Sequence, residues 1–168
     1  IPRIAVHEPG ERKPGQDVSS VIFNRDPETL GRPWVSPGMP NLLYRIGGIE
    51  KDIRTGNISY DAQNHQAMTQ LRADKVASVA KFIPPQTVEV GPDRGSIAVV
   101  GWGSTYGPGQ DACRQVREQG IEVAHAHLRH LNPFPANTGD VLRSYDRVLV
   151  PEMNLGQLGM LLRAKYLV

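Results

Sequence analysis

Cysteine is almost absent from this sequence, which carries a single one, Cys113, among 168 residues. A lone cysteine cannot form an internal disulfide, and it cannot supply the thiolate ligands of an iron–sulfur cluster. Chains without cysteine pairs are typical of a reducing compartment, so we expect a cytoplasmic location. No apolar run approaches about 18 residues and no signal peptide opens the sequence, so neither membrane insertion nor secretion is predicted.

An excess of charge of one sign is also lacking. Nineteen Lys and Arg stand against seventeen Asp and Glu, which gives a net charge of +2, and the two signs are interspersed. Proteins that bind nucleic acid or anionic membranes gather basic side chains on one face. We therefore expect no nucleic acid and no membrane among the partners. The hydrophobic share of 39% is that of an ordinary globular protein.

Periodic structure is missing from residues 1–58, which hold seven of the fourteen prolines and seven of the seventeen glycines. Proline fixes φ and glycine allows positive φ, so this composition predicts turns. We expect an extended arm that buries no core of its own. Disordered linkers lack large apolar side chains, whereas this arm has several, so we predict that it is ordered and packs on another part of the chain or on a partner. These side chains are Ile22, Phe23, Trp34, Leu42, Leu43, Tyr44 and Ile46.

Residues 59–95 are expected to form one helix and a linker. The helix is predicted over residues 60–83, where Asp61 can cap the N-terminus and Pro84-Pro85 stops the hydrogen-bond ladder. Its apolar residues recur at the period of 3.6 that places them on one face. They are Met68, Leu71, Val76, Val79 and Ile83.

Residues 96–168 alternate between strand and helix patterns, which predicts right-handed βαβ units. The fold class we expect is α/β, a three-layer αβα domain with a mostly parallel sheet, preceded by the arm and the helix. Strands are predicted at 96–102, 121–128 and 147–153. Helices are predicted at 109–120, with Ala112, Cys113 and Val116 inward, at 137–145, with Asn137 or Thr138 as the cap, and from 155 onward.

A glycine-rich turn, VVGWGSTYGPG, joins the first of these strands to the next helix. Its Gly101, Gly103 and Gly107 give a spacing one residue longer than the dinucleotide fingerprint. No carboxylate ends the next strand to hold a ribose, and no lysine follows the glycines, so nucleotide binding is disfavoured. Two interpretations remain open: a tight strand-to-helix turn where side chains would clash, and a set of free amides that receive an anion or a partner's carboxylate.

His125 and His127 alternate along a predicted strand and therefore share one face. A pair of this kind can ligate zinc, but no third ligand appears at a suitable spacing. Histidines that are exposed or satisfied by other groups are the favoured interpretation. No Ser-His-Asp set and no paired carboxylates for acid–base chemistry can be assembled by spacing alone.

Five segments together strongly resemble the α subunit of 2-oxoacid:ferredoxin oxidoreductases, especially the 2-oxoglutarate type. They are DPETLGRPWVSPGMPNLLYRIGGIEK, GNISYDAQNH, VVGWGSTYG, HAHLRHLNPFP and VLVPEMNLGQLGMLLRAKYLV. The resemblance covers residues 22–168, and residues 1–17 match nothing. HLRHLNPFP also resembles a D-L-R-T-L-x-P turn of transketolase-like C-terminal domains, with His127 in place of the Asp.

The resemblance implies a part of an enzyme that decarboxylates a 2-oxo acid oxidatively, forms an acyl-CoA and passes electrons to ferredoxin. Thiamine diphosphate, Mg2+ and a 4Fe-4S cluster belong to such an intact complex, and we expect none of them to be bound by this segment alone. The implied partners are a β subunit, ferredoxin and CoA. Residues 1–58 are then the end of an upstream pyrimidine-binding region, and residues 96–168 a transketolase C-terminal-like domain. The sequence begins with Ile and stops on the apolar KYLV, so we expect a fragment.

Polar residues follow each predicted strand, and the carboxyl ends of parallel strands are where ligands and neighbours gather. We expect this edge to face a subunit interface or the mouth of an active site. The candidate residues are Gly101, Gly103, Ser104, Thr105, Tyr106, His127, Arg129, Asn132, Asn154 and Gln157. No catalytic residue is assigned. Two other interpretations stay open: a non-catalytic module that binds a partner or an anion, and a free-standing dehydrogenase, which the missing ribose carboxylate disfavours.

Overall fold

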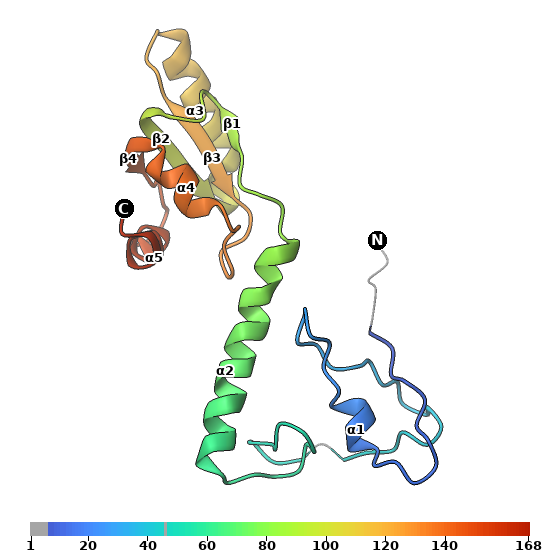
Figure 1. The fold of residues 1–168 in the computed structure, drawn as a ribbon. Helices are drawn as coiled ribbons and strands as arrows, with labels where there is room; N and C mark the ends of the chain where they lie inside the picture. The colour runs from blue at the N-terminus through green and yellow to red at the C-terminus, as the bar shows by residue number, and fades with distance from the viewer. Residues whose placement is uncertain (1–6, 46) are drawn as a thin grey trace. The chain divides into compact units, whose positions relative to one another are not determined.

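The computed structural model describes residues 7–45 and 47–168, and the chain divides into two compact units, Ile1–Val79 and Ala80–Val168. Figure 1 shows the elements of both units along the chain. Ile46, one of the apolar residues expected to anchor the arm, lies outside the described residues. No helix in the described part of the chain has both the length and the apolar character needed to cross a bilayer. The expected boundaries at residues 58 and 96 stay a prediction.

The second unit is built on a four-stranded sheet in the order β1-β3-β2-β4. Its strands are β1 (Val88–Val90), β2 (Gly95–Trp102), β3 (Ala124–Leu128) and β4 (Tyr145–Leu149). Strands β3 and β4 both run parallel to β2, with Ala98 opposite Ala124 and also opposite Val148. Only β1 is antiparallel, and it pairs with β3 at the edge. The mostly parallel sheet expected from the alternating pattern is confirmed.

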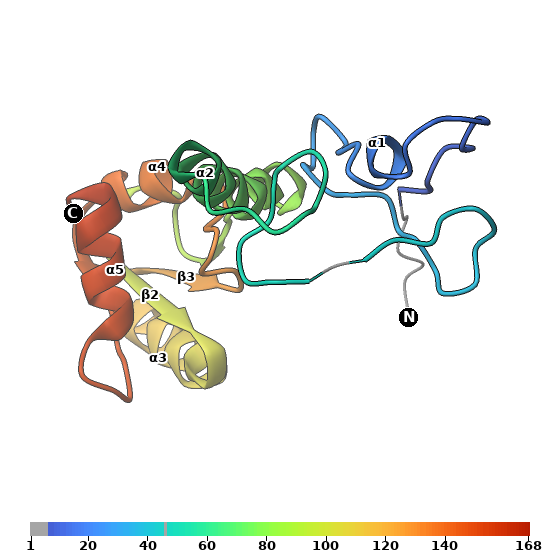
Figure 2. The same cartoon turned by 90° about the horizontal axis from the view of Figure 1, so that it is seen from below.

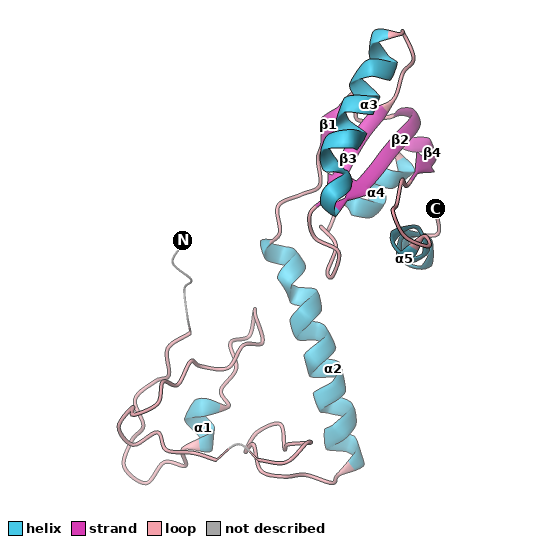
Figure 3. Cartoon of the chain, turned by 180° about the vertical axis from the view of Figure 1, so that it is seen from behind, coloured by secondary structure: helices cyan, strands magenta, loops and turns pink. Residues whose placement is uncertain are grey.

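Helices cover both faces of this sheet, as the three-layer prediction requires. They are α3 (Tyr106–Glu118), α4 (Thr138–Arg143) and α5 (Gln157–Tyr166). Figures 2 and 3 show α3 on one face, while α4 and α5 lie on the other. The core on the α4 and α5 face joins alternate residues of β2 and β3 to leucines of the two helices, because side chains two apart on a strand share a face. Its buried members include Ala98, Val100, Ala126, Leu142, Leu158 and Leu162.

Several local predictions for this unit need correction. The strand predicted at 147–153 is Tyr145–Leu149, and the strand predicted at 121–128 begins at Ala124. Helix α3 begins at Tyr106 rather than near residue 109, because proline and glycine are tolerated in a first turn whose amides have no intrahelical partner. Of the residues expected to face inward on it, Cys113 is buried but Ala112 is exposed. Asn137 precedes α4, yet its side chain does not cap the helix. Its amide instead bonds both backbone groups of Gln86, at 2.8 and 2.9 Å, and so fixes the chain that leads into β1.

The first unit has a small hydrophobic cluster, so the expectation of an arm without any core is wrong. Val21 and Ile22 of the short helix α1 (Ser19–Ile22) pack with Phe23 and Leu42, and all four are buried. The cluster forms because the turns of this region bring residues 21–23 and 42 together despite the lack of periodic structure. Trp34 and Leu43 stay exposed, at 65% and 93% of their surface.

Helix α2 (Ala62–Ser78) follows, and a short 3-10 helix at Val79–Phe82 extends it to near the predicted end. The predicted cap is confirmed, because Asp61 Oδ1 accepts a hydrogen bond from the Asn64 amide at 2.7 Å. The predicted apolar face is only partly covered: Met68 is half-buried, whereas Val76 is exposed. No residue of α2 is fully buried.

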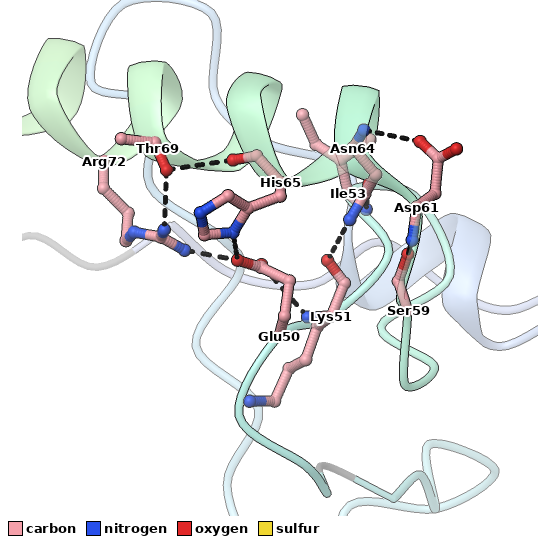
Figure 4. A network of polar contacts seen from close by, with 9 residues as sticks. All are labelled: Glu50, Lys51, Ile53, Ser59, Asp61, Asn64, His65, Thr69 and Arg72. Carbon is pink, nitrogen blue, oxygen red and sulfur yellow. Dashed lines mark hydrogen bonds and ion pairs between the residues drawn. The ribbon is translucent and has the colours of Figure 1, made fainter.

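Polar side chains fix the start of α2 to the preceding loop (Figure 4). The side chain of Asn64 makes two hydrogen bonds to this loop: Oδ1 accepts from Ile53 N at 2.9 Å, and Nδ2 donates to Lys51 O at 2.9 Å. The Glu50 carboxylate lies 2.6 Å from His65 Nδ1 and 3.6 Å from a nitrogen of Arg72. The hydrogen bond from His65 is the main reason that the pKa of Glu50 lies below its ordinary value.

Two six-residue turns with the same hydrogen bonds shape the first unit. They are Asp26–Gly31 and Asp52–Asn57, each with the pattern Asp-x-x-Thr. In each, the Asp amide donates to the carbonyl five residues on, and its carboxylate accepts from the amide and the hydroxyl of the Thr. The fifth residue has positive φ in both turns: Leu30 at 55° and Gly56 at 71°.

Gly56 is required for packing as well as for its φ, and this gives a testable prediction. A Cβ at Gly56 would lie 1.9 Å from Cζ of Phe23, whereas one at Gly38, which has a φ of +89°, meets nothing within 4 Å. We expect Gly56→Ala to lower the free energy of unfolding in urea by about 3 kcal/mol, from strain and overpacking combined. Gly38→Ala, which adds only strain, should cost about 1 kcal/mol. Equal losses in the two variants would contradict the packing role.

Candidate functional site

The carboxyl ends of the parallel strands meet at one edge of the sheet in the second unit. Trp102, the last residue of β2, stands opposite Leu128, the last residue of β3. The loops that leave β2, β3 and β4 therefore begin close together, which is the arrangement the sequence predicted for this edge.

The first loop at the edge is the turn from β2 into α3. A single 3-10 turn, Gly103–Thr105, makes the connection, and Gly103 adopts a φ of +59°. Thr105 Oγ1 donates to Trp102 O at 2.8 Å and accepts from Trp102 N at 3.2 Å, which ties the turn back onto the end of the strand. Ser104 is exposed at its tip.

Close packing explains why position 101, one residue before the end of β2, is a glycine. A Cβ at Gly101 would lie 2.9 Å from Thr105 Oγ1 and 3.3 Å from Nδ1 of His127. The glycine therefore makes room for the Thr105 hydroxyl on one side and for a buried imidazole on the other. Of the two interpretations left open for the glycine turn, a tight turn where side chains would clash has this direct support.

His125 and His127 lie beneath α3 on one face of β3, as their alternation predicted. His125 is fully buried and His127 is 5% exposed, with ring centroids 6.1 Å apart. Neither nitrogen of His125 has a hydrogen-bond partner in the described structure, and neither does Nδ1 of His127. The expectation that these histidines are exposed or satisfied by other groups is therefore wrong for His125 and for Nδ1 of His127. Burial lowers the pKa of both imidazoles, because the charged form loses its hydration.

Tyr106, the first residue of α3, covers the two histidines from the edge. Its ring meets that of His127 edge-on, with centroids 4.9 Å apart, and the guanidinium carbon of Arg129 lies 5.3 Å from the Tyr106 centroid. Arg129 also lies 3.4 Å from a carboxylate oxygen of Glu89 on β1. Gln110 donates to the Tyr106 hydroxyl at 3.1 Å. Aromatic, cationic and acidic groups from β1, β3 and α3 thus form one connected cluster, which spacing alone did not reveal.

A second cluster surrounds the start of α5. The Glu152 carboxylate accepts hydrogen bonds from the amides of Leu158 and Gly159, at 2.8 and 3.0 Å, and from the indole N–H of Trp102 at 3.3 Å. Asn154 Oδ1 accepts from the amides of Gly156 and Gln157. A carboxylate at a helix N-terminus balances the free amides and the helix dipole. Glu152 was not among the residues predicted from the sequence, although an acidic residue just before a helix is a visible signal.

Desolvation raises the pKa of Glu152, but the bonds from Gly159, Leu158, Asn154 and Trp102 together outweigh it, so the pKa lies below the ordinary value. A carboxyl group whose pKa is lower in the folded than in the unfolded state stabilises the fold at pH values above its unfolded-state pKa. That stabilisation is lost as the pH falls through the folded-state pKa.

The ten candidate residues thus fall into three groups. Gly101, Thr105, Tyr106, His127 and Arg129 come together around the β2–α3 turn. Asn154 and Gln157 lie at the start of α5, joined to the end of β2 through Glu152 and Trp102. Gly103, Ser104 and Asn132 are exposed at the edge, and the side chains of Ser104 and Asn132 take part in neither cluster.

The described residues do not fit a resident metal ion or cluster. No three His, Cys, Asp or Glu side chains of residues 7–45 and 47–168 gather closely enough to hold a metal. The single cysteine is buried, and burial raises the pKa of its thiol. Strand β3 ends without a carboxylate that could bind a ribose next to the β2–α3 turn. Nucleotide binding therefore stays disfavoured.

The space next to Gly101 can be tested by substitution. Gly101→Ala places a methyl group against Thr105 and His127, so we expect the free energy of unfolding to fall by about 2 kcal/mol. Gly107→Ala is the matched control, because a Cβ there meets nothing within 4 Å and alanine favours the helix. Chemical denaturation of both variants measures the difference. A neutral Gly101→Ala would contradict the close packing.

The role of Glu152 can be tested by pH. Glu152→Gln keeps the size but loses the charge, so we expect a loss of about 1 kcal/mol in unfolding free energy at pH 7. The difference from the unsubstituted chain should shrink as the pH falls below the ordinary glutamate pKa and through the lowered pKa of the folded state, because the carboxylate is then protonated. A difference that stays constant over this range would show that the charge has no part in it.

A family profile described as pyruvate:ferredoxin oxidoreductase core domain II matches residues 95–165, the span that holds the sheet edge and its loops. Subunit KorA of the 2-oxoglutarate oxidoreductase of Mycobacterium tuberculosis is 48% identical over 93% of this chain and 23% of its own length. The α subunit of 2-oxoacid:ferredoxin oxidoreductase 1 of Aeropyrum pernix is 33% identical over 80% of this chain and 21% of its own length.

A solved structure is also similar to this chain. It is the 2-oxoglutarate:ferredoxin oxidoreductase from Magnetococcus marinus with 2-oxoglutarate, coenzyme A and succinyl-CoA bound. The TM-score is 0.76 at 29% identity, over 85% of this chain and 25% of that one.

The α/β fold and the domain match define a core domain of the pyruvate:ferredoxin oxidoreductase type. The chain belongs to the 2-oxoacid:ferredoxin oxidoreductase family, as a segment related to its α subunits, and this confirms the resemblance noted in the sequence. The chain spans about a quarter or less of the length of the relatives it matches.

Proposed function

We propose that this chain is part of the α subunit of a 2-oxoacid:ferredoxin oxidoreductase, with 2-oxoglutarate as the 2-oxo acid. The enzyme decarboxylates the substrate oxidatively, transfers the acyl group to CoA and passes the electrons to ferredoxin. The observation that supports this best is the 48% identity to a 2-oxoglutarate oxidoreductase subunit over nearly the whole chain. The bound 2-oxoglutarate and CoA in the Magnetococcus marinus enzyme support the same substrates.

In this proposal the cofactors are held outside the described residues. Thiamine diphosphate with Mg2+ supplies the chemistry of decarboxylation, and a 4Fe-4S cluster supplies the path for electrons. The single buried cysteine and the lack of three clustered metal-binding side chains among the described residues support this placement. In this proposal the chain contributes architecture and contact with a β subunit.

The sheet edge at the β2–α3 turn is the surface proposed to make that contact. It presents exposed polar residues, Ser104 and Asn132, on a base that Gly101, Thr105 and Glu152 hold rigidly. Rigid loops on a packed scaffold are well suited to recognition, because little conformational entropy is lost on binding. We propose that the edge faces the β subunit or the mouth of the active site.

The activity is tested on the native complex. The α gene product is purified with its β subunit, and ferredoxin reduction is measured with 2-oxoglutarate and CoA, and with each omitted. We expect turnover that requires both. Absence of turnover with any 2-oxo acid, with an α product that has no β partner, would favour a non-catalytic binding module instead.

The contact surface is tested by adding bulk at exposed positions. Ser104→Trp and Asn132→Trp should weaken the association of α and β by at least about tenfold, because a large side chain would clash in a close interface. Glu118→Trp, at the exposed far end of α3, is the control and should leave the association unchanged. Co-purification and analytical ultracentrifugation measure the effect. If the two edge variants associate as tightly as the control, the edge is not the interface.

A further inference from the structure

The first of the two Asp-x-x-Thr turns brings two arginines together in the first unit. Asp26 N donates to Gly31 O at 2.9 Å and closes the base of the turn. The residues that flank this base, Arg25 and Arg32, therefore leave it side by side. Both line one cavity of about 360 Å³.

Neither arginine forms an ion pair with a carboxylate of the described residues. Arg25 donates to the carbonyl of Ile53 at 2.8 Å, and the Arg32 guanidinium carbon lies 4.9 Å from the centroid of the Phe23 ring. Within residues 7–45 and 47–168, the ion pairs of the structure involve other cations. Partial burial lowers the pKa of the Arg25 guanidinium, and the nearby charge of Arg32 lowers it further. Two like charges are thus held near each other and partly out of water, which is unfavourable unless an anion joins them.

The other charged groups around the cavity do not supply that anion. Lys51 and Arg72 add two further cations, against the carboxylates of Glu50 and Asp52. Glu50 is already engaged by His65 and Arg72, as Figure 4 shows. Asp52 Oδ1 accepts three bonds within its own turn, from the amides of residues 54 and 55 and from the hydroxyl of residue 55. The four cations and two carboxylates that line the cavity give it a formal charge of +2.

The two arginines also sit on rigid supports. Arg32 lies over the Phe23 ring, which belongs to the buried cluster of this unit and packs against Gly56. Arg25 is bonded to the loop that Asn64 of α2 holds in place through Ile53. Guanidinium groups fixed in this way lose little entropy when they bind an oxyanion, and their paired N–H groups match carboxylate and phosphate oxygens.

We propose that this cavity, which we name the Arg25–Arg32 pocket, binds a small doubly charged oxyanion, either a phosphoryl group or a dicarboxylate. Arg25 and Arg32 provide the direct hydrogen bonds, and Lys51 and Arg72 add long-range attraction. The pocket lies in a different unit from the sheet edge, so this proposal does not depend on the interface assigned there.

The test uses the full chain, with inorganic phosphate and succinate as separate probes at constant ionic strength. The Nε–Hε resonances of the arginines are followed by NMR during each titration. We expect saturable shifts at Arg25 and Arg32 below about 20 mM of the preferred probe. Tighter binding of phosphate identifies the phosphoryl class, and tighter binding of succinate identifies the dicarboxylate class.

Variants separate a built site from general attraction to positive charge. Arg25→Gln and Arg32→Gln should each weaken binding by at least about tenfold, because each removes a charge-assisted hydrogen bond. Arg94→Gln, an exposed arginine of the other unit, is the matched control and should bind as the unsubstituted chain does. Arg32→Lys keeps the charge but loses the planar group, so we expect an intermediate loss. Circular dichroism checks that each variant is folded.

The outcomes that would overturn the proposal are equally specific. They are shifts that do not saturate with either probe, shifts that Arg25 and Arg32 do not share, or a loss in Arg94→Gln equal to that in Arg32→Gln. If Arg25→Gln does not fold, Arg32→Gln and the shifts of the unsubstituted chain decide the question.

Discussion

The parallel pairing of β2 with both of its neighbours is the constraint on which the second unit depends. Because β3 and β4 run in the same direction as β2, each must return over a face of the sheet before it pairs, and α3 and α4 make these returns. The same geometry brings the three carboxyl ends to one edge. The edge loops are thus a consequence of the topology, and the residues on them are free to serve recognition.

At that edge, a glycine lies next to buried histidine side chains. Gly101 leaves space for His127, and the two buried histidines retain unpaired nitrogens at a cost to stability. Such a cost is tolerated at sites that have a role, and here the site lies under the proposed interface. The first unit is stabilised differently, because the hydrogen bonds of its two Asp-x-x-Thr turns, and not periodic packing, fix the path of its chain. Its Arg25–Arg32 pocket follows from one of those turns.

The periodic parts of this fold could be predicted from the sequence. Predictions failed where side chains join segments that lie far apart in the chain. The alternation of strands and helices after residue 95 predicted the sheet, and Asp61 marked the start of α2. Strand β1 was missed, since three residues beside a proline pair carry no pattern. Asn137 was read as a cap because its partner, Gln86, lies 51 residues away. The edge residues were predicted from topology, whereas the contact of Arg129 with Glu89 needs coordinates.

Hydrogen–deuterium exchange of the proposed α subunit, alone and with its β subunit, is the most direct test of whether the sheet edge is the contact surface. We expect slower exchange on association in the loops at residues 103–106, 128–132 and 152–157. Exchange in residues 118–122, at the opposite end of α3, should not change. Unchanged exchange in all three loops, with protection elsewhere on this unit, would contradict the assignment of the edge as the contact surface.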